Sequence, residues 1–178
     1  MAAADANEAR RRTLRERARL LAVAPQQEAA GEALELLIFE LARESYAVET
    51  AFVREVLTLK DLTPVPCTPR FVLGVINVRS EICPVIDLKR LFGLPERGLT
   101  NATRAVIVRH GGIEFGIVAD VVIGVRAVPL ASIAPPPTTL AGIHADFLRG
   151  IAGDGLVVLD AGKVLGHPSM VVREQVAD

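Results

Sequence analysis

Two halves of this 178-residue chain carry the same order of short apolar segments, and this duplication constrains the fold more than any single motif. The matched segments, at offsets of about seventy residues, are Tyr46-Ala-Val with Phe115-Gly-Ile, Val53 and Val56 with Val122 and Val125, 71–75 with 147–151, and Pro84-Val-Ile-Asp87 with Val157-Val-Leu-Asp160. In both halves, the last matched segment is followed by a short helical pattern that ends at a glycine. The chain is therefore predicted to be a duplicated small β unit.

A unit of about sixty residues with about five short strands buries both faces of its sheet only if it curls into a barrel. Hydrophobic residues make up 51% of the chain and aromatic residues only 4%, so Val, Ile, Leu and Ala must fill the core, as is typical of β structure. We expect a mainly β fold with two barrels packed side by side. A cleft between paired subdomains is where a ligand or partner would be sought.

The stretch from Gly74 to Leu94 is the clearest local pattern. A run of β-branched residues breaks at a polar tip, Arg79-Ser-Glu, and resumes as an apolar strand, which predicts a hairpin. Asp87 then suits the N-cap of a short helix, and Gly93 suits its end. From residue type alone, Arg79 fits either a solvated turn or a contact with a partner protein.

Further strands are expected on both sides of this hairpin, with turn and proline signals between them. The expected strands are 34–41, 46–49, 52–57, 104–109, 113–118, 121–125, 147–152 and 156–160. On the third of these, alternation places Val53 and Arg54 on opposite sides. The segments 62–66 and 129–137 are expected to be loops, and Gly111-Gly112 a two-residue turn that tolerates positive φ.

Charge and cysteine content exclude several classes of function. The 20 Lys and Arg residues are balanced by 21 Asp and Glu residues, so no overall field would attract nucleic acid or an anionic membrane. Cys67 and Cys83 lack the spacing of a zinc site and are expected to be buried thiols. The sequence therefore predicts no metal site and no cofactor.

Catalytic motifs are absent from the sequence as well. The histidines, His110, His144 and His167, lie on separate segments without a nucleophile motif and are expected to be surface or turn residues. Asp87 and Asp160 occupy the same place in the repeat, before a helix, so capping explains both. No catalytic residue is predicted, and the protein is expected not to be an enzyme.

We expect three parts: a helical extension and linker (1–31), the paired barrels (32–168) and a tail (169–178). Ala and Arg dominate the extension, and the composition of 8–24 favours a helix. This helix could be solvated, docked on this protein or on a partner, or bound to acidic lipid or nucleic acid. No secretion signal or long apolar run is found, so a soluble cytoplasmic protein is expected.

The hairpin Gly74-Val-Ile-Asn-Val-Arg-Ser-Glu-Ile-Cys-Pro-Val-Ile-Asp-Leu, with Phe92-Gly93, resembles the CheW family of bacterial chemotaxis coupling proteins. The likeness extends from about Leu34 to Leu165. It includes Phe52-Val-Arg-Glu-Val-Leu, Gly116-Ile-Val-Ala-Asp120, Leu148-Arg-Gly-Ile and Val157-Val-Leu-Asp. The resemblance implies two SH3-like five-stranded barrels, in agreement with the duplication.

The resemblance further implies a non-enzymatic scaffold that joins the cytoplasmic hairpin tip of methyl-accepting chemoreceptors to the regulatory domain of the histidine kinase CheA. Such a protein is cytoplasmic and is recruited to membrane-bound receptor arrays. Carried over by position, Arg79 matches a receptor-binding arginine, and Val53 and Glu55 match the neighbouring strand of the receptor-facing groove. Gly74 and Asn77 are expected to shape that surface.

Two features depart from the family pattern. Ser80 stands where the family usually has glycine, so the sequence leaves the conformation of the hairpin tip open. The Arg-rich extension before residue 32 lies outside the common domain. An alternative function is therefore a CheW-like regulatory module of a specialised motility or other two-component pathway, in which the extension sets the choice of partner.

Overall fold

A computed structural model describes residues 32–95, 103–137 and 143–166, without the side chains of 143 and 144. The strands are β1 (Ala33–Leu41), β2 (Glu44–Glu49), β3 (Val53–Thr58), β4 (Val72–Val78), β5 (Glu81–Ile86), β6 (Arg104–His110), β7 (Ile113–Ala119), β8 (Val121–Pro129), β9 (Ile133–Ala134), β10 (Leu148–Ala152) and β11 (Val157–Leu159). The helices are η1 (Thr50–Phe52), α2 (Leu88–Phe92), η2 (Leu130–Ser132), α3 (Ile143–Asp146) and α4 (Ala161–Gly166).

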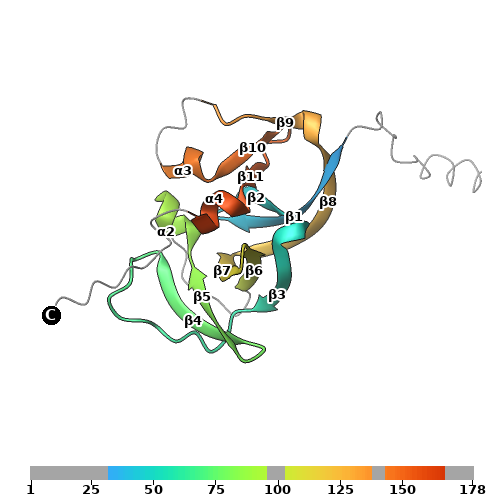
Figure 1. Cartoon of the computed structure of the whole chain (residues 1–178). Coiled ribbons are helices and arrows are strands. Elements are labelled where there is room, and N and C mark those ends of the chain that lie inside the picture. Colours follow the sequence, from blue (N-terminus) through green and yellow to red (C-terminus); the bar gives the residue numbers. More distant parts are fainter. Residues whose placement is uncertain (1–31, 96–102, 138–142, 167–178) are drawn as a thin grey trace, which may run out of the picture. The chain divides into compact units, whose positions relative to one another are not determined.

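The strands form two sheets (Figure 1). One has the order β8-β1-β2-β11-β10-β9 and the other β3-β6-β7-β5-β4. Since the chain begins in the six-stranded sheet, builds the five-stranded sheet and then returns, the two subdomains are intertwined. The predicted mainly β fold with two SH3-like subdomains is confirmed. Only one sheet has the predicted five strands, because the two-residue strand β9 adds a sixth strand to the edge of the other. The predicted boundaries at 31 and 168 stay predictions, because the extension and the tail lie outside the described residues.

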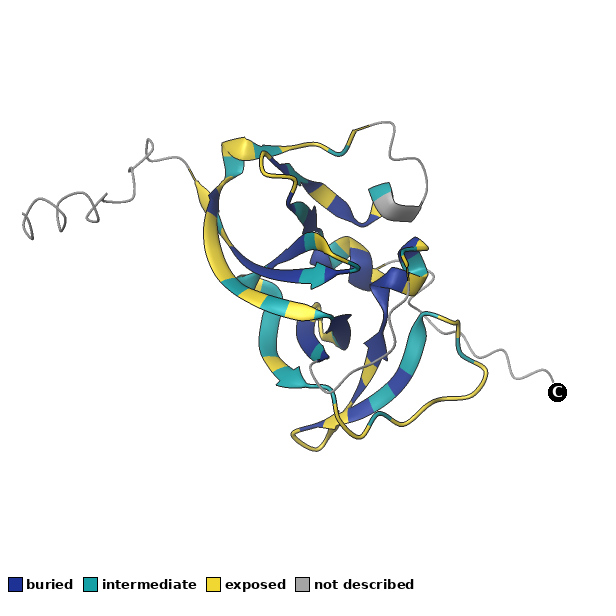
Figure 2. Ribbon diagram, turned by 180° about the vertical axis from the view of Figure 1, so that it is seen from behind, coloured by how far each residue is buried: buried dark blue, intermediate teal, exposed yellow. Residues whose placement is uncertain are grey.

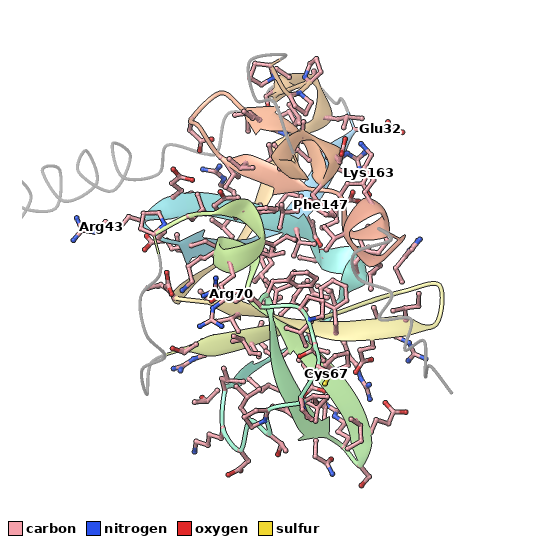
Figure 3. All side chains as sticks on the ribbon, turned by 90° about the vertical axis from the view of Figure 1, so that its left-hand side faces the viewer. Glu32, Arg43, Cys67, Arg70, Phe147 and Lys163 are labelled. Carbon is pink, nitrogen blue, oxygen red and sulfur yellow. The ribbon has the colours of Figure 1, made fainter. Side chains whose placement is uncertain are left out.

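A joint hydrophobic core lies between the sheets and draws side chains from both. Aromatic rings run through it, with centroid distances of 6.5 Å from Phe39 to Tyr46, 6.2 Å from Tyr46 to Phe92 and 5.9 Å from Phe92 to Phe147. Figure 3 shows Phe147 in the interior. Smaller aliphatic clusters fill each subdomain separately. The sparse aromatic residues are thus concentrated where the two subdomains meet.

The β4–β5 and β10–β11 hairpins confirm the internal repeat. Both contain a register shift, between Val72 and Gly74 in the first and between Leu148 and Gly150 in the second. Each hairpin is also extended by a parallel partner, β7 beside β5 and β2 beside β11. The two halves of the chain therefore build their sheets on one plan.

The helix after each hairpin is capped as predicted. The Asp87 carboxylate accepts a hydrogen bond from the Lys89 amide (2.9 Å), and α2 ends at Gly93, whose φ of 66° is left-handed. The Asp160 carboxylate accepts from the Lys163 amide (3.0 Å) at the start of α4. Burial raises the pKa of Asp87, against the opposing effect of the Lys89 charge. Both aspartates are therefore explained without catalysis.

A buried ion pair joins α2 to the other sheet. Lys89, only 1% exposed, extends its Nζ to 2.5 Å from Asp120 Oδ1. The other carboxylate oxygen of Asp120 accepts a hydrogen bond from the Ala42 amide (2.9 Å), in the turn between β1 and β2. Because a buried charge is tolerated only when it is paired, this contact fixes α2 against the six-stranded sheet.

Two sequence predictions were wrong in part. The connection 129–137 contains η2 and the short strand β9, which pairs with β10 through Ala134 and Ile151. Cys67 is exposed in the segment between β3 and β4 (Figure 3), whereas Cys83 is buried as expected. Burial raises the pKa of the Cys83 thiol to about 11, so this thiol stays protonated at neutral pH.

His110 is the histidine whose side chain lies within the described residues. His110 is exposed at the end of β6 and packs edge-on against Phe52, with centroids 5.1 Å apart. The side chains of His144 and His167 lie outside the described residues. None of the helices in the described ranges is long and apolar enough to cross a membrane.

Candidate functional site

A bulge in β3 determines where its charged side chains point. Val53 pairs with Val108 and Glu55 pairs with Ile107, so Arg54 is an extra residue between two consecutive partners. Such a bulge bends the strand and redirects side chains. Val53 packs against the joint core, whereas Arg54 contacts carboxylates on β5 and β7, which confirms that these two side chains face opposite sides.

The tip of the β4–β5 hairpin is a two-residue turn with positive φ at both positions. Arg79 has φ of 50° and Ser80 has φ of 70°, as in a type I′ turn. The Asn77 side chain supports this turn by accepting a hydrogen bond from the Ser80 amide (2.8 Å). Ser80 therefore adopts the conformation that glycine, the usual family residue, would adopt more easily.

Two arginines and three carboxylates form a charged cluster beneath and beside this tip, which we call the tip cluster: Arg54, Glu55, Arg79, Glu81 and Glu114. Arg79 Nε lies 3.0 Å from Glu55 Oε1. Arg54 Nη1 lies 2.8 Å from Glu81 Oε2 and 2.7 Å from Glu114 Oε2. The Arg79 side chain is 70% exposed, whereas that of Glu55 is 25% exposed. The cluster thus presents one guanidinium to solvent above a half-buried carboxylate.

Hydrogen bonds within the tip cluster favour the ionised forms. Donation from Arg54 lowers the pKa of Glu81, and the charge on Arg109 acts weakly in the same direction. Acceptance by Glu81 and Glu114 raises the pKa of Arg54. Arg54 and Glu81 are therefore held in their charged forms, which suits a surface for electrostatic recognition more than proton transfer.

Gly74 lies at the other end of the hairpin and is buried. Its φ is 149°, and a Cβ there would stand 2.2 Å from the carbonyl oxygen of Thr63. Thr63 forms an isolated bridge with Val75, with hydrogen bonds of 2.8 and 2.9 Å between their backbones. Glycine is therefore needed at position 74 for the close approach of two backbones.

The structure thus brings together only part of the residues predicted from the resemblance. Arg79 and Glu55 are in contact, and Asn77 supports the turn that carries Arg79. Val53 packs on the joint core, and Gly74 lies at the base of β4. The sequence reasoning missed the other three members of the tip cluster as site residues. The only signal for them was their charge on otherwise apolar strands, which does not reveal their pairing.

Exposed apolar side chains also lie on strands of both sheets. On the five-stranded sheet, Ile82 is 69% and Ile113 is 52% exposed, one beside the tip and one at the start of β7. On the six-stranded sheet, β8 exposes Val121, Ile123 and Val125 (Figure 2). Among the described residues, no group of three or more His, Cys, Asp or Glu side chains could hold a metal ion. Arginine is enriched at protein interfaces, so Arg79 beside the exposed Ile82 is the part of this surface that most resembles one.

Comparison with known proteins relates this arrangement to one family. A family model described as CheW-like domain matches residues 35–169. Chemotaxis protein CheW of Treponema pallidum is 33% identical over 146 residues, which cover 78% of this chain and 86% of that protein. Protein FrzA of Myxococcus xanthus is 39% identical over 103 residues, covering 58% of this chain and 64% of that protein.

A solved structure agrees with these sequence matches. The crystal structure of scaffolding protein TtCheW from Thermoanaerobacter tengcongensis matches with a TM-score of 0.65 at 36% sequence identity. The match covers 72% of this chain and 90% of that one. The sequence, the two intertwined sheets and the β4–β5 hairpin lead to the same conclusion: the chain belongs to the CheW-like domain family.

Proposed function

We propose that the protein is a non-enzymatic scaffold of a chemotaxis-type signalling system, which binds both a chemoreceptor and a CheA-type histidine kinase. Similarity to proteins named chemotaxis protein CheW and scaffolding protein supports this role. The observation that carries the receptor contact is the ion pair of Arg79 and Glu55, held at an exposed hairpin tip. Such a pair at a surface is more useful for recognition than for stability.

The receptor partner in this proposal is the helical hairpin tip of a chemoreceptor. The Arg79 guanidinium can bind a carboxylate or the carbonyl end of a helix, while its stem packs on apolar groups. Glu55 sets the direction of that guanidinium, and Val53 lies on the same strand at the edge of the joint core. Apolar contacts would supply affinity and the charges would fix the register of the receptor helix.

The proposed place of action is the cytoplasm, at membrane-bound receptor arrays. A single contact of this size would be weak and reversible, and many such contacts in an array would strengthen one another. No cofactor is needed for this role. Recruitment would therefore depend on the receptor and not on a membrane anchor in this domain.

A second candidate is a regulatory module of a specialised pathway. The similarity to FrzA favours it, because that relative of 39% identity carries a name other than CheW. In this version the segment 1–31 sets the partner. Deleting residues 1–30 should then abolish binding to the specific partner, and unchanged binding would remove this candidate.

The proposal is tested by reconstituting receptor-dependent autophosphorylation of the kinase with the purified protein. The native chain should couple the two proteins, and Arg79→Ala and Glu55→Ala should remain folded but couple poorly. Arg126→Ala is a suitable control, since Arg126 forms a similar exposed ion pair with Asp154 on the other sheet (2.6 Å). If the native chain binds neither receptor fragment nor kinase, the proposal is wrong.

A further inference from the structure

The end of the β4–β5 hairpin lies beyond its backbone pairing with the rest of the sheet, although the Val78 and Cys83 side chains are buried against β6 and β7. The pairing of β5 with β7 spans Val85 with Gly116 and Ile86 with Ile117. The segment 81–84 lies beyond these pairs, and Figure 1 shows the hairpin extending past the neighbouring strands. Buried side chains hold the two strands as far as Val78 and Cys83, but the exposed residues 79–82 need another attachment if Arg79 is to keep one position.

Arg54 provides that attachment from the bulge in β3. Its Nη1 donates to Glu81, the first residue after the turn, and to both carboxylate oxygens of Glu114 on β7, at 2.7 to 2.8 Å. Its Nε lies 3.8 Å from Glu55 Oε1. One guanidinium thus joins three strands and approaches the carboxylate that pairs with Arg79.

The two carboxylates held by Arg54 differ in their surroundings. Glu114 is 15% exposed and lies on β7, which is paired with β6 from Arg104 to His110. Glu81 is 65% exposed and directly follows the turn, beyond the pairing of β5 with β7. Glu114 therefore orients the Arg54 guanidinium, and the guanidinium in turn holds Glu81 and the tip.

We propose that Arg54 is a positioning residue for partner binding: it fixes the β4–β5 tip so that Arg79 and Glu55 meet the partner in one geometry. This inference rests on the proposed function, because the partner contact is the receptor contact described above. Arg54 itself is 23% exposed and acts through Glu81 and Glu55. Without it, Arg79 would be the one arginine left in the tip cluster beside three carboxylates, with only a weak contribution from the charge on Arg109, and the repulsion between the carboxylates would move the tip.

Hydrogen–deuterium exchange of the full chain tests whether Arg54 fixes the β4–β5 tip. Arg54→Gln should raise the exchange rates of backbone amides in 77–83 by about tenfold, because the tip would open more often. Arg54→Lys keeps a positive charge between Glu81 and Glu114 and should restore most of the protection. Arg126→Gln is the matched control, since it breaks the Arg126–Asp154 pair and should leave 77–83 unchanged.

Affinity for a purified receptor cytoplasmic fragment tests the consequence. Arg54→Gln should weaken binding by about tenfold while the melting temperature stays near that of the native chain, and Arg54→Lys should bind within about threefold of native. Unchanged exchange, or unchanged affinity, in Arg54→Gln overturns the inference. If the native chain does not bind the fragment, the proposed function is wrong, and so is the proposed role of Arg54 in receptor binding. The exchange result then still decides whether Arg54 holds the tip.

Discussion

The β4–β5 hairpin and the β10–β11 hairpin occupy equivalent places in the two sheets. In each, the amide of the capping aspartate donates to a phenylalanine carbonyl: Asp87 to Phe71 at 2.7 Å and Asp160 to Phe147 at 2.9 Å. Each also has a glycine at its register shift, where a Cβ would strike a neighbouring backbone oxygen. These shared contacts all lie at the bases of the hairpins, where the fold requires them.

The two hairpins differ at their tips. β4 and β5 contain seven and six residues and end in Arg79 and Ser80, whereas β10 and β11 contain five and three residues and end in the turn 153–155. Each tip is held by an arginine from an edge strand, Arg54 on β3 or Arg126 on β8. The longer tip alone brings a second arginine into its cluster. The comparison indicates that the base preserves the fold and the tip is free to acquire a binding role.

The bulges in the two edge strands also occupy equivalent positions but carry different side chains. The extra residue in β3 is Arg54, and the extra residue in β8 is Ile123, between the partners of Ile38 and Phe39. These positions are 69 residues apart, which is the offset of the internal repeat. At one of them a charged side chain supports the tip, and at the other an apolar side chain is 57% exposed.

The largest expected effect concerns the two base glycines. Gly74→Ala should lower the free energy of unfolding by about 3 kcal/mol, because its Cβ would overlap Thr63 O and its φ is unfavourable for alanine. Gly150→Ala should cost about 2 kcal/mol, because its Cβ would overlap Ala134 O and Ile133 Cγ2 but its φ is not left-handed. Chemical denaturation measures both.

Gly153→Ala is the control for these variants, since a Cβ at Gly153 meets nothing within 4 Å and its φ is not left-handed. It should change the free energy of unfolding by less than about 0.5 kcal/mol. If Gly74→Ala is equally neutral, the two hairpin bases are not constrained by close backbone contact.

The two capping aspartates should contribute less to the free energy of unfolding than the base glycines do. Asp87→Ala should cost about 2 kcal/mol, because Asp87 is buried and the Lys89 amide would lose its partner away from water. Asp160→Ala should cost about 1 kcal/mol, because Asp160 is only half-buried and water can reach the Lys163 amide. Equal losses in thermal denaturation would show that burial does not distinguish the two caps.

The turn at the longer tip predicts a gain in stability. Ser80→Gly should raise the free energy of unfolding by about 1 kcal/mol, since glycine adopts the observed φ of 70° without strain. Arg126→Gln, on the other sheet, serves as a surface control for the same measurement. A loss of stability in Ser80→Gly would mean that the native tip does not contain this left-handed turn.

The smallest effect is the response of the two tips to acid. The pKa of Glu81 is lowered below 4.5 by Arg54, and that of Asp154 below 3.8 by Arg126. For a lowered folded-state pKa, the stabilising contribution is complete above the ordinary value and is lost as pH falls through the folded-state value. Amide protection, taken relative to the intrinsic exchange rate at each pH, should therefore fall only below about pH 4.5 at the β4–β5 tip and below about pH 3.8 at the β10–β11 tip. Arg54→Gln should abolish the response at 77–83.

Local patterns were sufficient to predict the parts of the fold that depend on neighbours in sequence. The hairpin, the Asp87 cap and the Gly93 stop each follow from a few adjacent residue types. Strand β9 was missed because a proline-rich segment gives no strand signal, although two residues still pair with β10. The exposure of Cys67 likewise depends on how a long loop lies over the sheet, which composition does not reveal.

The candidate site was less predictable for a different reason. The resemblance identified Arg79 and Glu55, but their contact depends on how β3 lies against the hairpin tip. Strict alternation also gives no bulge at Arg54, so its pairing with Glu81 and Glu114 required the register of three strands. Charge pairs between distant strands follow from topology, and the sequence alone does not determine that topology at single-residue precision.

The most direct test of the central claim compares the two hairpin tips in one binding experiment. Calorimetric titration of a receptor cytoplasmic fragment into Arg79→Ala and Asp154→Ala measures what each tip contributes. We predict that Arg79→Ala weakens binding by at least about tenfold and that Asp154→Ala stays within about twofold of the native chain. Equal effects, or a larger loss in Asp154→Ala, would contradict the assignment of partner binding to the β4–β5 tip.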